Sequence, residues 1–258
     1  MVMKEQIALI LASGNSVARP TRWKLPVVGL ALLAALSTTA FAQMGGGANS
    51  ELQQKLMALK QASAENKQKL HQYQWVETTQ ITLKGEQKPE RVYQCSYGPN
   101  GQVQKVPMGA PPQQSSGREG RLKQRVIEKK TDEMKEYMQQ VQSLLSMYVP
   151  PNPQLMQQAF QKGNVSMNKT MGGNLVNLVF KNYAKPGDQM TVAFDTGTRK
   201  VSTINVNTFM DSPSDVVTLA VQMASLPDGT NYAQQTVLNA TAKQIQVTTN
   251  NANYAKLQ

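Results

Sequence analysis

Hydrophobic residues recur at helical spacing in the first long segment of the chain, between residues 50 and 70. Ser50 precedes the segment and is a favourable N-cap residue. Apolar positions three or four residues apart lie on one face of a helix. Here they are Leu52, Leu56, Leu59 and Ala62. The intervening positions are polar, so we predict an amphipathic helix that lies on another part of the fold.

A second apolar stripe runs through residues 118–149. Its members again lie on one helical face: Ile127, Met134, Met138, Val141, Leu145 and Tyr148. A dimeric coiled coil and a helix laid across a sheet both account for this pattern, and we favour the helix on a sheet. Pro150 and Pro151 end the helix. Pro153 fits the first turn of a short helix over residues 154–161.

Most of the remaining chain alternates with a period of two, which is typical of strands. Strands are predicted at 73–83, 91–97 and 103–106, and in the C-terminal half at 175–180, 189–194, 201–209, 216–223, 230–238 and 244–249. Turn residues separate these segments without intervening helices, so the pairing is antiparallel. The predicted fold class is α+β, with a curved, half-barrel-like antiparallel sheet packed on an N-terminal helix and a central helical insertion.

The first 42 residues have the organisation of a secretory signal peptide. Arg19, Arg22 and Lys24 precede an apolar run over residues 25–36, and Ala40-Phe41-Ala42 fits a cleavage site. The run is shorter than the ~20 residues of a membrane span, so we expect cleavage between Ala42 and Gln43 and no integral membrane span afterwards. The prediction is a periplasmic protein with a flexible leader at 43–49 and one domain at 50–258, which contains a helical insertion at about 118–162.

Candidate chemistry is scarce in this sequence. The only cysteine is Cys95, which excludes an internal disulfide and is expected to be a buried, inert thiol. His71 is the only histidine, and we expect it to cap the first helix and not to bind a metal. Five aspartates lie at predicted turns or beside Gly, Pro or Ser, where such side chains stabilise turns: Asp188, Asp195, Asp211, Asp215 and Asp228. We therefore predict no catalytic residues, no metal site, no cofactor and no enzymatic activity.

Methionine and tryptophan supply the one candidate ligand site. Thioethers suit an adaptable apolar surface, although they equally suit an irregular core. The residues proposed to line an apolar groove are Met134, Met138, Val141, Leu145 and Trp75.

A candidate partner surface comes from the charge distribution. The chain carries a formal net charge of +11, and basic residues are most concentrated between residues 118 and 135. Arg121, Lys123 and Arg125 are the candidate contacts to an envelope protein or an anionic surface. The alternative is a solvated helix face, because acidic residues at helical spacing are interleaved with the basic ones. Nothing in the pattern indicates binding to nucleic acid.

The order of the elements over Ser50 to Thr249 resembles the half-barrel superfamily of periplasmic lipoprotein carriers and related sigma-factor regulators. That resemblance is topological, and it implies a curved sheet whose concave apolar face receives acyl chains. It favours a soluble periplasmic binding or carrier-like protein with a lipid or lipoprotein ligand. The alternative is a non-catalytic structural or interaction protein of the envelope. A hydrolase is the weakest of the functional hypotheses, because residues that activate a nucleophile or water are missing.

Overall fold

The computed structural model describes residues 46–109, 121–169 and 173–257. Side chains are described from residue 49 onward and, in the second long helix, from residue 132. The predicted signal peptide and its cleavage point at Ala42 lie outside the described residues.

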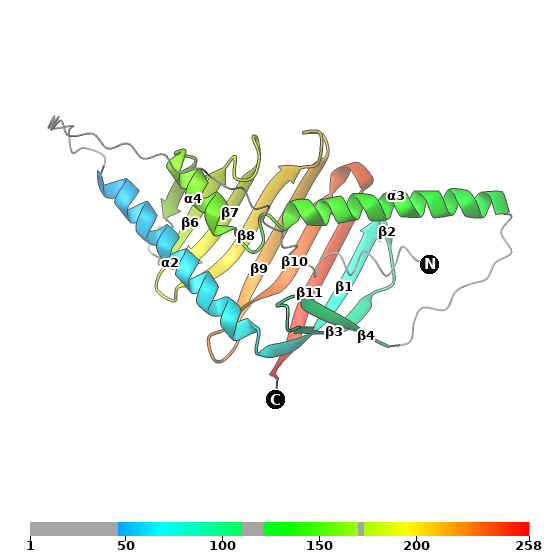
Figure 1. Cartoon of the computed structure of the whole chain (residues 1–258), viewed down its shortest axis with the longest axis horizontal. Helices are drawn as coiled ribbons and strands as arrows, with labels where there is room; N and C mark the ends of the chain where they lie inside the picture. Colours follow the sequence, from blue (N-terminus) through cyan, green and yellow to red (C-terminus); the bar gives the residue numbers. More distant parts are fainter. Residues whose placement is uncertain (1–45, 110–120, 170–172, 258) are drawn as a thin grey trace, which may run out of the picture.

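One antiparallel sheet dominates the described structure. Its eleven strands run in the order β4-β3-β1-β11-β10-β9-β8-β7-β6-β5, with β2 also paired to β1 (Figure 1). The strands are β1 (Tyr73–Leu83), β2 (Glu86–Gln87), β3 (Arg91–Tyr97), β4 (Val103–Met108), β5 (Val165–Lys169), β6 (Leu175–Lys181), β7 (Gln189–Asp195), β8 (Lys200–Phe209), β9 (Val216–Ser225), β10 (Asn231–Ala240) and β11 (Ile245–Lys256). Strand β11, the last described strand, thus pairs with β1, the first described strand, next to β3 and β4 in the order.

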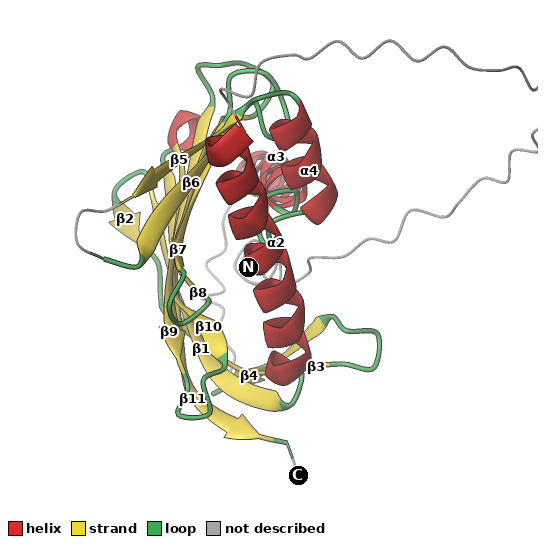
Figure 2. Cartoon of the chain, turned by 90° about the vertical axis from the view of Figure 1, so that its left-hand side faces the viewer, coloured by secondary structure: helices red, strands yellow, loops and turns green. Residues whose placement is uncertain are grey.

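Three helices lie on one side of this sheet, which curves around them (Figure 2). They are α2 (Gly46–Leu70), α3 (Arg121–Leu145) and α4 (Pro153–Gln161). Figure 1 shows α3 crossing one end of the strands, whereas α2 crosses the sheet obliquely. The predicted α+β class and half-barrel-like sheet are confirmed.

The main core forms between the concave face of the sheet and the helices. Both predicted helical stripes contribute to it: Leu59 is 1% exposed, and Met138 and Val141 are fully buried. From the sheet, Phe180 and Phe194 are also fully buried. Alternate residues of β8, from Ile204 to Thr208, are buried, in agreement with the period-two alternation from which this strand was predicted. Burial of this apolar surface is the main source of stability, because the only cysteine is unpaired.

Buried Asp188 organises the turn between β6 and β7. Its carboxylate accepts hydrogen bonds from the backbone amides of Tyr183, Ala184 and Lys185. It also accepts a hydrogen bond from the hydroxyl of Tyr148, just after α3. The carboxylate therefore ties the end of the helical insertion to the sheet. The turn role predicted for this aspartate is confirmed.

Several element boundaries differ from the prediction. Helix α2 begins at Gly46, ahead of the predicted N-cap Ser50, so part of the predicted flexible leader is helical. Helix α3 ends at Leu145, a few residues earlier than predicted. Strand β5 was missed because Val165–Lys169 is short and mostly polar. Strand β11 continues to Lys256, well past the predicted end at Thr249.

Replacement of Asp188 should weaken the fold. In Asp188→Asn, the amide nitrogen would face backbone donors, and a buried donor left unsatisfied costs about 1–3 kcal/mol. We expect urea-induced unfolding to show a decrease of that size in the free energy of unfolding. Asp211→Asn, at an exposed turn position, is the matched control and should change it little. Equal effects of the two substitutions would contradict the role assigned to Asp188.

Candidate functional site

The concave face of β1 is divided into three zones along the strand. Tyr73 and Trp75 come first, polar Glu77 and Thr79 follow, and Ile81 belongs to the main core. All five side chains are buried. Because alternate residues of a strand point to the same face, these zones follow one another on one surface. The polar zone therefore separates two apolar regions.

The first apolar region is an aromatic cluster formed by Trp75, Tyr93, Tyr97 and Tyr254, around the buried thiol of Cys95. The Trp75 ring stacks on Tyr254, with centroids 5.6 Å apart and planes within 12°. It also lies 5.4 Å from the Tyr97 ring. The cluster is separate from the main core beneath the helices. Strands β1, β3 and β11 position its rings.

Polar atoms at the margin hold the cluster in place. Trp75 Nε1 donates to Asn251 Oδ1 at 3.1 Å, and Tyr73 donates its hydroxyl hydrogen to Asp228 at 2.6 Å. The hydrogen bond from Tyr73 is the main cause that lowers the pKa of Asp228. The same bond raises the pKa of Tyr73. Burial raises the pKa values of Tyr97 and Tyr254, so these two phenols are neutral at neutral pH.

His71 does not act as the predicted helix cap. Its backbone amide donates to Lys67 O at 3.3 Å, but its ring stacks on Tyr97 with centroids 4.3 Å apart. Nε2 is buried without a hydrogen-bond partner. Burial, followed by the charge of Lys67, lowers the imidazole pKa. The ring is therefore neutral at pH 7 and extends the aromatic surface.

The polar zone continues across the sheet as a polar band, which we define as Glu77, Thr79, Arg91, Lys105 and Thr249. Lys105 forms an ion pair with Glu77, and the two side chains are only 5% and 7% exposed. Thr79 donates its hydroxyl hydrogen to Glu77 at 3.1 Å. Arg91 Nη1 lies 3.5 Å from the Tyr93 hydroxyl. Buried charges of this kind are stabilised mainly by their partners, so the band depends on its internal contacts.

The structure places the predicted groove residues in two separate places. Met138, Val141 and Leu145 are buried in the main core, and Met134 is half-buried against it. Trp75 belongs to the aromatic cluster. The sequence analysis named Trp75 but missed its neighbours. The signal available was the period-two spacing of Tyr73 with Trp75 and of Tyr93 with Tyr97.

The predicted basic contacts lie in the N-terminal part of α3. Arg121, Lys123 and Arg125 belong to this helix, and their side chains are outside the described set. Figure 1 shows that this part of α3 extends beyond β1 and β2.

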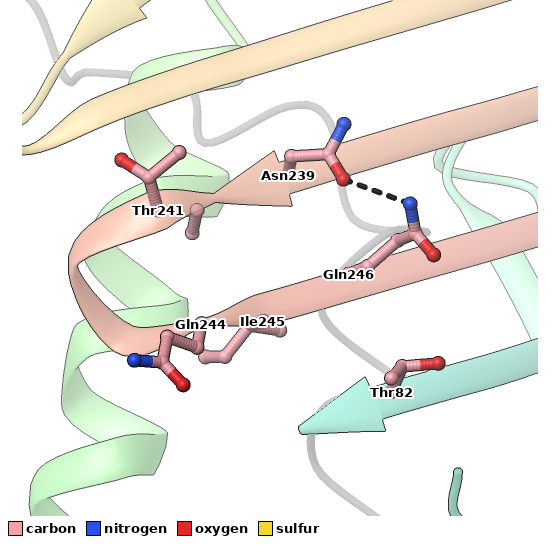
Figure 3. A pocket seen from close by; sticks show the side chains of 7 residues that line it. Thr82, Asn239, Thr241, Gln244, Ile245 and Gln246 are labelled. Carbon is pink, nitrogen blue, oxygen red and sulfur yellow. Dashed lines mark hydrogen bonds between the residues drawn. The ribbon is translucent and has the colours of Figure 1, made fainter. Parts of the chain in front are cut away.

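A shallow pocket of about 300 Å³ lies at the β10–β11 turn (Figure 3). Its lining consists of Thr82, Asn239, Ala240, Thr241, Gln244, Ile245 and Gln246. Asn239 Oδ1 accepts a hydrogen bond from Gln246 Nε2 at 3.0 Å. None of the seven residues is ionisable, so we assign no chemistry to this pocket.

Two further features bear on the kind of site present. Among the described residues, no group of His, Cys, Asp and Glu side chains is arranged to hold a metal ion. No helix in the same part of the chain is long and apolar enough to cross a membrane.

Comparison with known proteins gives similarity at the level of fold. No protein-family profile and no curated protein matches the sequence. Similar solved structures include a DUF1329 family protein from Desulfovibrio piger, with 7% identity, a TM-score of 0.39, and coverage of 79% of this chain and 92% of that one. A putative outer membrane lipoprotein-sorting protein domain from Vibrio parahaemolyticus has 8% identity, a TM-score of 0.39, and coverage of 80% and 93%. A LolA superfamily protein from Nitrosomonas europaea has 8% identity, a TM-score of 0.36, and coverage of 79% and 93%.

All three TM-scores are below 0.5, and the three identities are below 10%. Because the TM-scores and identities are low, we draw nothing about ligands or partners from them. The functional proposals rest on the side chains of this chain.

Cys95 should be unreactive while the protein is folded. The residue is fully buried, and burial, followed by the charge of Glu77, raises the pKa of its thiol to about 12. Because the thiolate is the reactive species, we expect no reaction with Ellman's reagent at pH 8 in native buffer. One equivalent should react after unfolding in guanidinium chloride. Prompt reaction of the native protein would show that the aromatic cluster is open to solvent.

Proposed function

We propose that the protein is a non-catalytic, carrier-like binding module that holds a hydrophobic or lipidic ligand on the concave face of its sheet. The observation that carries this proposal is the aromatic cluster, an apolar surface on that face that is distinct from the main core. Small-molecule sites are typically concave and lined by aromatic side chains with a few polar groups. The cluster and the adjoining polar band have this composition.

The cluster supports ligand contact better than the groove predicted beneath α3. Met138 and Val141 are fully buried there, so a ligand would have to displace the helix. In the aromatic cluster, Tyr97 and Tyr254 are only half-buried. Flat aromatic rings offer a large contact area with little loss of conformational freedom. We therefore place the ligand against these rings.

We propose no catalytic role because the cysteine and histidine side chains, the two most reactive types here, are held in inert forms. The Cys95 thiol has a raised pKa and is fully buried. The neutral His71 ring is stacked on Tyr97. Asp188, Asp195 and Asp228 accept hydrogen bonds from backbone amides of turns, and Asp188 and Asp228 also accept them from tyrosine hydroxyls. We further propose export to the periplasm through the predicted signal peptide, with cleavage between Ala42 and Gln43.

Ligand binding should be measurable with a fluorescent fatty acid. We expect saturable binding at micromolar concentration, because the aromatic cluster supplies a defined apolar surface. Tyr254→Ala removes a half-buried ring from that surface and should weaken binding roughly ten-fold, the equivalent of about 1.4 kcal/mol. Val106→Ala truncates a side chain that is 63% exposed on β4 and should leave the affinity unchanged.

A second measurement leaves the aromatic cluster unchanged, so its result does not depend on whether the Tyr254→Ala variant folds. In the proposed mature protein, which begins at Gln43, Trp75 is the sole tryptophan, so its emission should change on titration with unlabelled fatty acid. Absence of saturable binding in both assays would remove the carrier-like proposal.

One observation favours a second candidate function, contact with an anionic membrane surface. The N-terminal part of α3 extends beyond β1 and β2, and it carries Arg121, Lys123 and Arg125. A basic helix in this position can approach a negatively charged surface without obstruction from the sheet.

Reversal of these three charges to Glu should abolish co-sedimentation with anionic phospholipid vesicles at low salt, because each basic residue near such a surface contributes about 1 kcal/mol. The control reverses three exposed lysines of α2, Lys60, Lys67 and Lys69, with the same change in net charge. Equal losses in the two variants would indicate a general charge effect and contradict a specific role of α3.

A further inference from the structure

Two side chains of the polar band have buried polar atoms without a hydrogen-bond partner. They are Nη2 of Arg91 and Oγ1 of Thr249, and Thr249 is only 5% exposed as a whole residue. A buried polar atom without a partner costs free energy unless a water, an ion or a ligand supplies the missing bond. These atoms therefore indicate that something polar completes the site.

The register of the sheet brings the two residues to one place. Thr79 pairs with Arg91 on β3 and with Thr249 on β11, so all three lie in one row. Adjacent strands are about 4.8 Å apart, which puts the backbones of Arg91 and Thr249 roughly 10 Å from each other across Thr79. A guanidinium group on its long side chain and a hydroxyl group from the opposite side can therefore contact the same small group.

The charges in the band determine what that group is. Glu77 and Lys105 neutralise each other in their ion pair. Within the described part of the chain, no carboxylate pairs with Arg91, and its guanidinium contacts the Tyr93 hydroxyl at 3.5 Å. The band therefore has one uncompensated positive charge, held by a guanidinium whose planar donors match a carboxylate or phosphate. A monoanionic group fits this charge, whereas a cation is excluded.

The surroundings determine what the anionic group is attached to. The polar band is flanked by the main core on one side and by the aromatic cluster on the other. On the side of the aromatic cluster, the rings of Tyr97 and Tyr254 are half-buried and can be reached by a ligand. An anion seated at Arg91 and joined to an apolar body would lay that body across Trp75 and Tyr254.

We propose that the polar band binds the anionic head group of an amphiphile, with Arg91 and Thr249 as its contacts, and that the apolar body lies on the aromatic cluster. The inference rests on the proposed function and adds the class of ligand, a single-chain amphiphile with a monoanionic head. Arg91 Nη2 donates to an oxygen of the head group, and Thr249 donates its hydroxyl hydrogen to the same group.

Calorimetric titration of the full chain with dodecanoate and with the neutral analogue dodecanol tests the inference. Wild-type protein should bind dodecanoate more tightly than dodecanol. Arg91→Gln should weaken dodecanoate binding by roughly ten-fold to a hundred-fold, as expected for a charge-assisted hydrogen bond, and should leave dodecanol binding unchanged. Arg91→Lys should restore part of the difference.

Two further variants keep the test decisive. Thr249→Val removes the hydroxyl at nearly constant volume and should lower dodecanoate affinity a few-fold in a chain that retains Arg91. Arg199→Gln, at an exposed position, is the matched control for loss of a positive charge and should have no effect. Circular dichroism confirms that each variant is folded before titration.

Each outcome has a defined meaning. Equal binding of dodecanoate and dodecanol, unaffected by Arg91→Gln, would overturn the head-group site while the carrier-like function stands. Absence of binding for both ligands would overturn the function and the inference together. Arg91-dependent binding of acetate or inorganic phosphate as tightly as dodecanoate would identify a site for a free oxyanion and would also overturn the amphiphile assignment.

Discussion

Burial of the concave face of the sheet is the constraint on which the rest of the structure depends. A single curved sheet without disulfides is stable only if its apolar face is removed from water. Helices α2, α3 and α4 do this over the main core, where Leu59, Met138 and Val141 interlock with strand residues. The same requirement explains why the helical insertion returns to the sheet and is fixed there through Tyr148 and Asp188.

The polar band interrupts this apolar face, which gives the face a second role. A continuous hydrophobic surface from Ile81 to Tyr73 would be the simplest way to extend the core. Instead, charged and hydroxyl groups separate the helix-covered core from the aromatic cluster, at the cost of burying Glu77 and Lys105. Unpaired polar atoms at Arg91 and Thr249 persist in that position. Such an arrangement is understandable if the interruption serves ligand recognition and not stability.

The elements that depend on local pattern could be predicted from the sequence, whereas the site could not. The stripe through Leu52, Leu56 and Leu59 determined which face of α2 is buried, and the alternation in β1 determined which residues face the core. Strand β5 was not predicted, because Val165–Lys169 forms a strand through its pairing with β6 and not through its own composition. The aromatic cluster and the polar band require β11 to pair with β1, a contact between opposite ends of the chain. No local signal connects Arg91 with Thr249, or Trp75 with Tyr254. Trp75 was therefore predicted as a candidate, but it was grouped with helix residues that belong to the main core.

The central claim is that the ligand lies on β1, β3 and β11, with its anionic head group at the polar band. A crystal structure of the protein with dodecanoate tests this claim most directly. The account predicts a carboxylate within about 3.2 Å of Arg91 Nη2, with the alkyl chain against Trp75 and Tyr254. A bound chain located beneath α3, among Met138 and Val141, with Arg91 contacting only water, would contradict it.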